Sequence, residues 1–250
     1  MQLNPQVALS RDPRLTLRLA DGPKDLLRVQ KLRFNVFGLE MGAQLASASQ
    51  GIDCDEYDAL CDHLMVEDRA SGKVVGTYRM LSPSAAARAP SLYSEHEFNL
   101  SRLAHLRPNL IEIGRSCVHK NFRSGAVITL LWAGLADYVH KHGCSYLAGC
   151  ASVSLADGGH QAVSLYRQLE TSHLSPADWR VFPLLPLPLE RIVDDAAPAP
   201  MPALIKGYLR AGAYVCGEPA WDPDFNCADF FMLMSMDRLN QRYNKHFIDR

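Results

Sequence analysis

The sequence predicts a mixed α/β fold of the α+β type, with a central twisted sheet flanked by helices. Segments with the alternating pattern of strands recur along the chain, separated by stretches with the three- or four-residue spacing of amphipathic helices. The 250 residues are 48% hydrophobic and 21% charged, which is typical of a globular protein. We therefore expect one domain over residues 1–250, with a flexible amino terminus at 1–13.

The first third of the chain predicts a strand, a helix and a hairpin. Leucines alternate with polar residues over 15–19, and Asp21 can cap an amphipathic helix that runs to Phe37. A polar loop of small residues follows. Two apolar segments, 62–68 and 73–81, then flank a turn in which Gly72 suits a positive φ.

The rest of the chain predicts alternating strands and helices. Residues 82–109, rich in Pro, Ala, Ser and Arg, predict short helices or irregular structure. The elements expected after them are a strand at 110–118, a basic glycine turn at 119–125, a helix at 126–141, a strand at 145–153, a helix at 160–170, a proline-rich connector at 182–202, a short helix at 203–213, a buried strand at 228–236 and a polar helix at 237–250.

Charge and cysteine content limit the class of function. The net charge of −1 argues against a protein that coats nucleic acid. The seven cysteines form no C-x-x-C pair, and the amino terminus lacks the basic and apolar regions of a signal peptide. The longest apolar run is shorter than the roughly 20 residues that cross a membrane. We expect a cytoplasmic protein.

Two charged residues interrupt the strand expected at 110–118. In strict alternation, Glu112 and Arg115 point to opposite faces. Glycine within a strand is typical of a bulge or of close approach by a ligand. We predict a bulge near Gly114, where the sheet splays, which brings both side chains to one face.

The turn after this strand places Lys120, Arg123 and a glycine at the start of a helix. Unpaired N–H groups and the helix dipole favour a phosphate there, so a phosphorylated or pyrophosphate-bearing ligand fits. A solvated first turn explains the same residues equally well.

In this order, the elements resemble the GNAT acyltransferases, whose glycine turn holds the pyrophosphate or phosphopantetheine of the acyl carrier. That family commonly has R/Q-x-x-G-x-G/A, of which this chain keeps the basic residue, one glycine and the small residue after it. Blocks such as LRFNVFGLEMG, DCDEYD, GKVVGTYRML and EIGRSCV resemble acyl-homoserine-lactone synthases. YDALCDHLMV, EIGRSCVHKNFRSGAVITLLWAGL and PALIKGYLRAGAYVCGEPAWDPDFNCADFFMLM are similar to the ornithine acyltransferases of ornithine-lipid synthesis, also described as hemolysin-like.

The resemblance implies an N-acyltransferase that moves a 3-hydroxyacyl group from acyl carrier protein to the α-amino group of ornithine, giving lyso-ornithine lipid. It implies no permanently bound cofactor, because the acyl carrier thioester is a co-substrate. Two alternatives stay open: a signal synthase that uses S-adenosylmethionine, and a non-enzymatic membrane-binding protein. Lysine and glutamine stay open as acceptors. The leucine- and proline-rich segment 182–192 either contacts a membrane peripherally or packs on the protein's own core.

Glu112 is the predicted general base, because partial burial on a strand can raise the pKa of a carboxylate. An ion pair with Arg115 or another arginine is the alternative role. Tyr166 is the predicted acid for the leaving thiolate, with core packing as its alternative. We predict no metal site, because the histidines near residue 140 suit a helix C-terminus without one.

The resemblance also implies two binding sets. The amino substrate is expected at Arg33, Asp55, Asp58 and Arg79, in a network with Arg115, which is predicted to be catalytic together with Glu112 and Tyr166. Without the resemblance, a solvated acidic loop explains Asp53 to Asp58 equally well. The pantetheine arm is expected at Lys120, Arg123, Ser124, Gly125 and Ala126. Residues 102–123 carry five basic side chains against Glu112, a local charge of +4 that could dock an acidic carrier protein or merely aid solubility.

Overall fold

The computed structural model describes residues 12–192 and 200–237. These residues form two compact units. The first contains the described residues up to Ser82 together with Ile113–Gly143, and the second contains Pro83–Glu112 together with the described residues from Cys144 onward. Strand β5 (Leu110–Val118) contributes to both. The prediction of one domain over 1–250 stays a prediction, and the expected flexible terminus lies largely outside the described residues.

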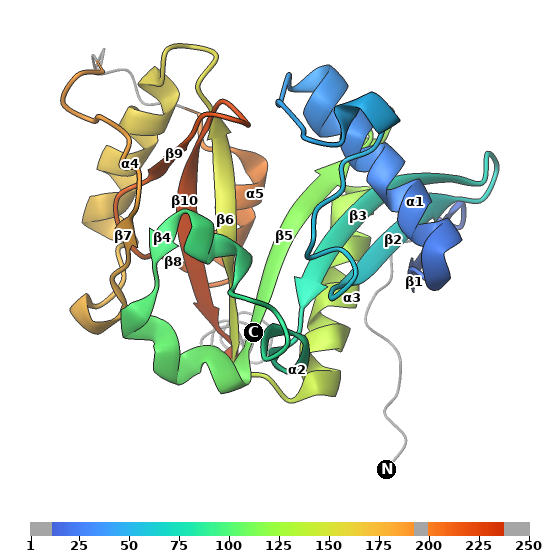
Figure 1. Cartoon of the computed structure of the whole chain (residues 1–250), viewed down its shortest axis with the longest axis horizontal. Coiled ribbons are helices and arrows are strands. Elements are labelled where there is room, and N and C mark those ends of the chain that lie inside the picture. Colours follow the sequence, from blue (N-terminus) through green and yellow to red (C-terminus); the bar gives the residue numbers. More distant parts are fainter. Residues whose placement is uncertain (1–11, 193–199, 238–250) are drawn as a thin grey trace, which may run out of the picture. The chain divides into compact units, whose positions relative to one another are not determined.

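An antiparallel sheet with a long helix on each face forms the first unit (Figure 1). Strand β1 (Leu15–Leu19) pairs with β2 (Asp62–Asp68), which pairs with β3 (Lys73–Leu81). In strand order, β5 follows β3. The helical elements are α1 (Gly22–Arg33), the π-type helix η1 (Phe34–Glu40), the 3₁₀ turns η2 (Ala48–Gln50) and η5 (Lys120–Phe122), and α3 (Ala126–His142).

Alternation along β2 explains why both faces of this sheet are covered. Met65 packs with Val29 and Leu32 of α1 in one apolar cluster. The neighbouring Val66 points to the other face and pairs with Gly76 of β3. A Cβ at Gly76 would lie 2.3 Å from Cγ1 of Val127 in α3, so glycine is needed for helix and strand to approach this closely.

The second unit is built around β10 (Cys227–Ser235), in which every residue is buried. On one side it pairs with β6 (Tyr146–Ser154), and on the other with β8 (Tyr214–Val215) and β9 (Ala220–Asp222), all antiparallel. Residues Leu110–Glu112 of β5 run parallel to β6. The remaining elements are α2 (Pro83–Ala86), η3 (Tyr93–His96), β4 (Phe98–Asn99), η4 (Ser101–Asn109), α4 (His160–Ser172), η6 (Ala177–Trp179), β7 (Phe182–Pro183) and α5 (Ala203–Arg210).

These elements confirm the predicted mixed α/β fold, in which helices flank a sheet of parallel and antiparallel strands. The short helices expected over 82–109 are present, and Gly72 has the expected positive φ, 65°. Residues 193–199 of the predicted connector, and the expected polar helix beyond Asp237, lie outside the described residues. No helix in the described part of the chain has the length and apolar character needed to span a membrane.

Strand β5 has an irregular backbone conformation at Arg115, next to the glycine near which a bulge is predicted. Arg115 has a left-handed φ of 48°, whereas Gly114 is not among the glycines with positive φ. A non-glycine residue in this conformation costs about 1–3 kcal/mol and is typical of functional sites. The extra residue of a ladder bulge stays a prediction.

Candidate functional site

A buried charged network in the first unit brings together five of the predicted site residues. Its three arginines and three aspartates balance in charge: Arg33, Arg79, Arg115, Asp53, Asp55 and Asp58. Arg33 has no exposed side-chain surface. Its Nε donates to Oδ2 of Asp53 at 2.7 Å, and its two Nη atoms donate to the two carboxylate oxygens of Asp58 at 2.9 and 2.7 Å.

Asp58 is held by three donor side chains. Besides Arg33, it accepts hydrogen bonds from Nη1 of Arg79 at 3.0 Å and from Nε2 of Gln30 at 2.9 Å. Burial alone would raise the pKa of Asp58, but the hydrogen bonds and positive charges of Arg33 and Arg79 outweigh burial and hold that pKa well below its ordinary value. The acceptor positions of Asp58 are thus occupied, and its binding of the amino substrate stays a prediction.

Asp55 and Arg115 form the accessible edge of this network. Their side chains are 22% and 13% exposed, against 5% or less for the other four. Nη1 of Arg79 lies 2.6 and 2.7 Å from the two Asp55 oxygens. Arg115 makes longer contacts, 3.5 Å to Asp55 and 3.3 Å to Asp53. A polar substrate can therefore reach Asp55 and Arg115 while breaking the fewest short ion pairs of the network.

Asp53 and Gln30 belong to the network although sequence analysis gave neither a role. Asp53 opens the same acidic loop as Asp55 and Asp58, and its carboxylate contacts two arginines. Gln30 precedes Arg33 by three residues and therefore lies on the same face of α1. The only sequence signal was this three-residue spacing between Gln30 and Arg33 within the predicted helix.

Glu112 lies in the second unit, is 5% exposed, and accepts backbone hydrogen bonds from Tyr93 at 2.7 Å and Ser94 at 2.8 Å. These two donors begin the 3₁₀ turn η3, where N–H groups lack partners within the helix. The carboxylate thus fixes this turn, a structural role different from the ion pair considered above. Its role as general base stays a prediction.

Tyr166 lies on α4 and is 6% exposed. Burial, together with the negative charges of Glu170 and Glu218, raises the pKa of Tyr166 to about 12. The phenol is therefore protonated at neutral pH and has a proton to donate. Burial on the inner face of a helix is equally typical of a core aromatic, so the acid role stays a prediction.

The basic turn begins α3 in the first unit. Gly125 has φ of 100°, which favours glycine and ends the turn just before Ala126, the first residue of the helix. Arg123 donates to the carbonyl of Val118 at 3.0 Å and pairs with Glu40. This guanidinium is therefore already engaged. Phosphate or pantetheine binding by Lys120, Arg123, Ser124, Gly125 and Ala126 stays a prediction.

The stretch 102–123 carries less net positive charge than its sequence indicates. Carboxylates from elsewhere in the chain pair with three of its five cations: Glu95 with Arg107, Asp53 and Asp55 with Arg115, and Glu40 with Arg123. Arg102 donates instead to the carbonyl of Ala177. Within the described residues, Arg102 and Lys120 are the two cations of this stretch without an ion pair.

Residues 32–133 match the family model of the acetyltransferase (GNAT) domain. Two solved structures share the fold. The AHL synthase LasI has a TM-score of 0.52 at 15% identity, with 89% of this chain and 90% of that one covered. FeeM, an N-acyl amino acid synthase from uncultured soil microbes, has a TM-score of 0.56 at 10% identity, with 93% and 96% covered. The protein is an acyltransferase of the GNAT class.

Similarity to curated relatives extends over nearly the whole chain. An L-ornithine N(alpha)-acyltransferase of Brucella abortus is 35% identical, with 96% of this chain and 91% of the relative covered. The same enzyme of Rhodobacter capsulatus is 34% identical, with 94% and 95% covered. The chain belongs to the L-ornithine N(alpha)-acyltransferase family, which confirms the resemblance seen in the sequence.

Proposed function

We propose that this protein transfers a 3-hydroxyacyl group from acyl carrier protein to the α-amino group of L-ornithine, forming lyso-ornithine lipid and releasing the carrier thiol. One observation carries the choice of acceptor. Four curated relatives matched over 93% or more of this chain are L-ornithine N(alpha)-acyltransferases. The AHL synthase LasI shares the fold at 15% identity, which makes a signal synthase that uses S-adenosylmethionine the weaker alternative.

The reaction needs a base for the ammonium, donors for the carbonyl oxygen and an acid for the thiolate. We assign the base to Glu112, acting directly or through a water. Two backbone N–H groups fix the orientation of its carboxylate, and one of its four lone-pair directions suffices to accept a proton. Backbone N–H groups beside Arg115 are the proposed oxyanion donors, and Tyr166 the proposed acid.

Two glycines in the first unit support an acyl thioester site. A Cβ at Gly114 would meet no described atom within 4 Å, and Gly114 does not have a positive φ. Neither packing nor backbone conformation therefore requires glycine at this position. A thioester arm lying along the strand would require it, because a side chain would occupy the space of the arm. The turn at Gly125 presents the unpaired N–H groups at the start of α3, with Lys120 and Ser124 as proposed phosphate contacts.

A peripheral membrane contact is part of the proposal, because the product is a lipid. Phe182, Leu184 and Leu185 are 52%, 59% and 47% exposed in the connector, and the guanidinium of Arg102 lies 5.0 Å from the centroid of the Phe182 ring. Apolar side chains beside a cation suit an anionic bilayer surface. Sedimentation with anionic vesicles should retain the wild type and lose the Leu184→Ser variant.

The deciding experiment incubates purified full-length protein with one of two donors, 3-hydroxyacyl carrier protein or the matching acyl-coenzyme A. Each donor is combined with one of four acceptors: ornithine, lysine, glutamine or S-adenosylmethionine. Free thiol is followed with time, and the product is identified by mass spectrometry. Ornithine-dependent thiol release with an N-acylornithine product is expected. Release only with S-adenosylmethionine would assign the protein to signal synthesis, and release only from acyl-coenzyme A would contradict the proposed carrier.

A further inference from the structure

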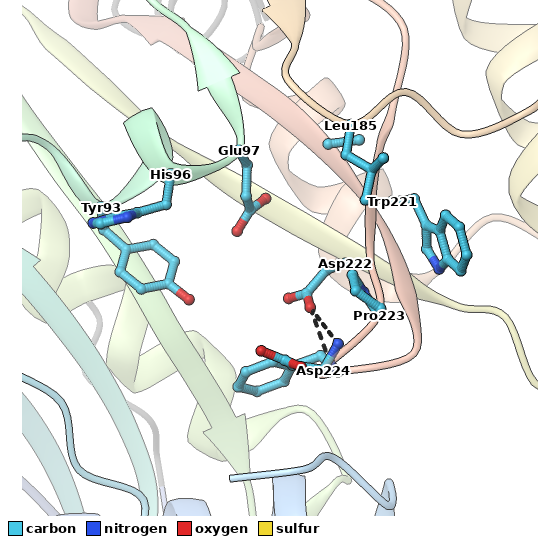
Figure 2. Close-up of a pocket in the computed structure, with 10 residues that line it drawn as sticks. Tyr93, His96, Glu97, Leu185, Trp221, Asp222, Pro223 and Asp224 are labelled. Carbon is cyan, nitrogen blue, oxygen red and sulfur yellow. Dashed lines mark hydrogen bonds between the residues drawn. The ribbon is translucent and has the colours of Figure 1, made fainter. Parts of the chain in front are cut away.

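The second unit contains an acidic pocket that none of the roles above uses (Figure 2). Its walls come from the segment 93–97, from Leu185 and from residues 220–225. The volume is about 250 Å³, slightly below the roughly 300–1,000 Å³ of pockets for drug-sized ligands. The pocket therefore suits a small molecule or one end of it.

Four carboxylates gather at this pocket. Glu97, Asp222 and Asp224 line it, and Asp229 lies next to them on the buried strand β10. Oδ1 of Asp222 accepts the N–H groups of Asp224 at 2.9 Å and Phe225 at 3.0 Å, which fixes its direction. Figure 2 shows the carboxylates of Glu97 and Asp222 pointing into the same space, with the hydroxyl of Tyr93 directed toward it.

These carboxylates lack the cations that the first unit supplies to its own aspartates. Among the described residues, no ion pair includes Glu97, Asp222, Asp224 or Asp229. Oε2 of Glu97 is buried and has no hydrogen-bond partner in the described part of the chain. Burial and the charges of Asp229 and Asp222 raise the pKa of Glu97 to about 9. The carboxyls of Glu97 and Asp229 are hydrogen-bonded to each other, which requires a proton on one of them. A cationic ligand is the other source of positive charge for this cluster.

We propose that this pocket binds the side-chain ammonium group of the diamino acid acceptor, between the carboxylates of Glu97 and Asp222. This inference rests on the proposed function and specifies how its acceptor is recognised. Charge-assisted hydrogen bonds to two carboxylates favour an ammonium group. Tyr93 and Phe225 add aromatic rings to the lining, and such rings attract organic cations.

A divalent metal is the competing cation. Asp222, Cys227 and Asp229 each offer an atom within 4.8 Å of the others. However, the oxygens of Asp229 already accept hydrogen bonds from Oγ of Ser152 at 2.6 Å and from Sγ of Cys227 at 3.6 Å. Burial and neighbouring carboxylates raise the pKa of the Cys227 thiol, which favours its protonated form. The site is better arranged for an ammonium group.

The pocket shares one short turn with the proposed base. Glu112 accepts the backbone N–H of Tyr93, whose ring lines the pocket. An acceptor with its ammonium group in this pocket would therefore be positioned by the same turn that Glu112 fixes. The pocket thereby selects an amino acid with a second positive charge, and norvaline, which has the same chain length without that charge, should be a poor acceptor.

The test measures steady-state kinetics of full-length Glu97→Gln and Asp222→Asn with ornithine and with norvaline. We expect KM for ornithine to rise about tenfold or more in each variant, a loss of one charge-assisted contact, with kcat within about twofold and norvaline kinetics unchanged. Asp178→Asn is the matched control, because it removes the same charge at an exposed position of the same unit. Both pocket variants should fold, since each removes repulsion between acids.

Calorimetry of ornithine binding without an acyl donor tests the pocket assignment separately from the proposed acyl transfer. If the wild type acylates ornithine but both variants keep its KM and affinity, the pocket assignment is wrong while the proposed function stands. If the wild type binds ornithine through Asp222 but never acylates it, the function is wrong while the pocket stands. If Mg²⁺, Ca²⁺ or Zn²⁺ raises the melting temperature of the wild type but not of Asp222→Asn, and ornithine does not bind, the pocket is a metal site.

Discussion

Replacing Arg33 with methionine tests whether the charged network of the first unit is primarily structural. Methionine keeps much of the side-chain length but removes the guanidinium that contacts Asp53 and Asp58. These carboxylates are 4% and 3% exposed, so the variant leaves two buried acids without their main counterion. Removing one partner of a buried ion pair costs about 3–5 kcal/mol. With about 2–4 °C per kcal/mol for a chain of this size, the melting temperature should fall by about 6–20 °C.

Arg115→Met is the matched control, because it makes the same chemical change at the accessible edge of the network. The contacts of Arg115 are 3.3 and 3.5 Å long, and its partners Asp53 and Asp55 each keep a shorter contact to another arginine, so its loss should cost less stability than the loss of Arg33. Calorimetric unfolding and ornithine kinetics would be measured on both variants. We expect Arg33→Met to lose stability and Arg115→Met to lose activity. Equal melting temperatures for Arg33→Met and the wild type would refute this division of roles.

Three further outcomes follow from the same contacts. Folding lowers the pKa of Asp58, so its carboxylate stabilises the fold above its ordinary pKa of 3.8, and this stabilisation is lost as pH falls below that value. The Asp58→Asn variant should therefore lose less stability than the wild type between about pH 5 and 2 in acid unfolding. For Glu97 the sign is opposite: its pKa is about 9 in the folded protein against an ordinary 4.5, so folding takes up a proton between these pH values and stability falls as pH rises. Compared with the wild type, the Glu97→Gln variant should gain stability at pH 8 relative to pH 5. A melting temperature with the same pH dependence in both proteins would contradict this. The Gly114→Ala variant should keep the wild-type melting temperature, because open space surrounds the position, but should have a higher KM for the acyl donor. The Gly125→Ala variant should also have a higher donor KM and should lose about 1–2 kcal/mol of stability, because its φ of 100° is left-handed. Equal donor KM values for Gly114→Ala and the wild type would mean that the thioester arm does not lie along β5.

Local pattern was sufficient to predict most elements of the fold. The alternation at 15–19 and the apolar run at 228–236 are strands β1 and β10, because each pattern suits the burial found: one half-covered edge strand and one strand buried throughout. The helix predicted up to Phe37 instead becomes a π-type helix from Phe34. The three- or four-residue periodicity of the sequence carries no signal for that change.

The candidate site was harder to predict because its partners are distant in the sequence. Glu112 accepts its hydrogen bonds from the 3₁₀ turn at 93–96, inside a stretch predicted to be short helices or irregular structure. The sequence does not show which backbone N–H groups of that stretch reach Glu112, so an ion pair was the predicted alternative. Glu40 neutralises Arg123 from a helix more than eighty residues earlier. A count of charges along 102–123 could not include it. The aspartates of DCDEYD were recognisable as a group, but not which of them would be saturated by arginines.

Among the described residues, the aspartates of the charged network and the carboxylates of the acidic pocket differ in where their counterions come from. In the first unit, Arg33, Arg79 and Arg115 neutralise three aspartates, and the lowered pKa of Asp58 keeps that carboxylate in its charged form. In the second unit, burial without a cation pushes the pKa of Glu97 upward instead. A buried carboxyl that takes up a proton in the absence of a ligand can exchange that proton for an ammonium group. Ornithine binding near pH 7.5 should therefore release protons, and calorimetry in buffers of different ionisation enthalpy would count them; binding without proton release would mean that Glu97 does not meet the ammonium group.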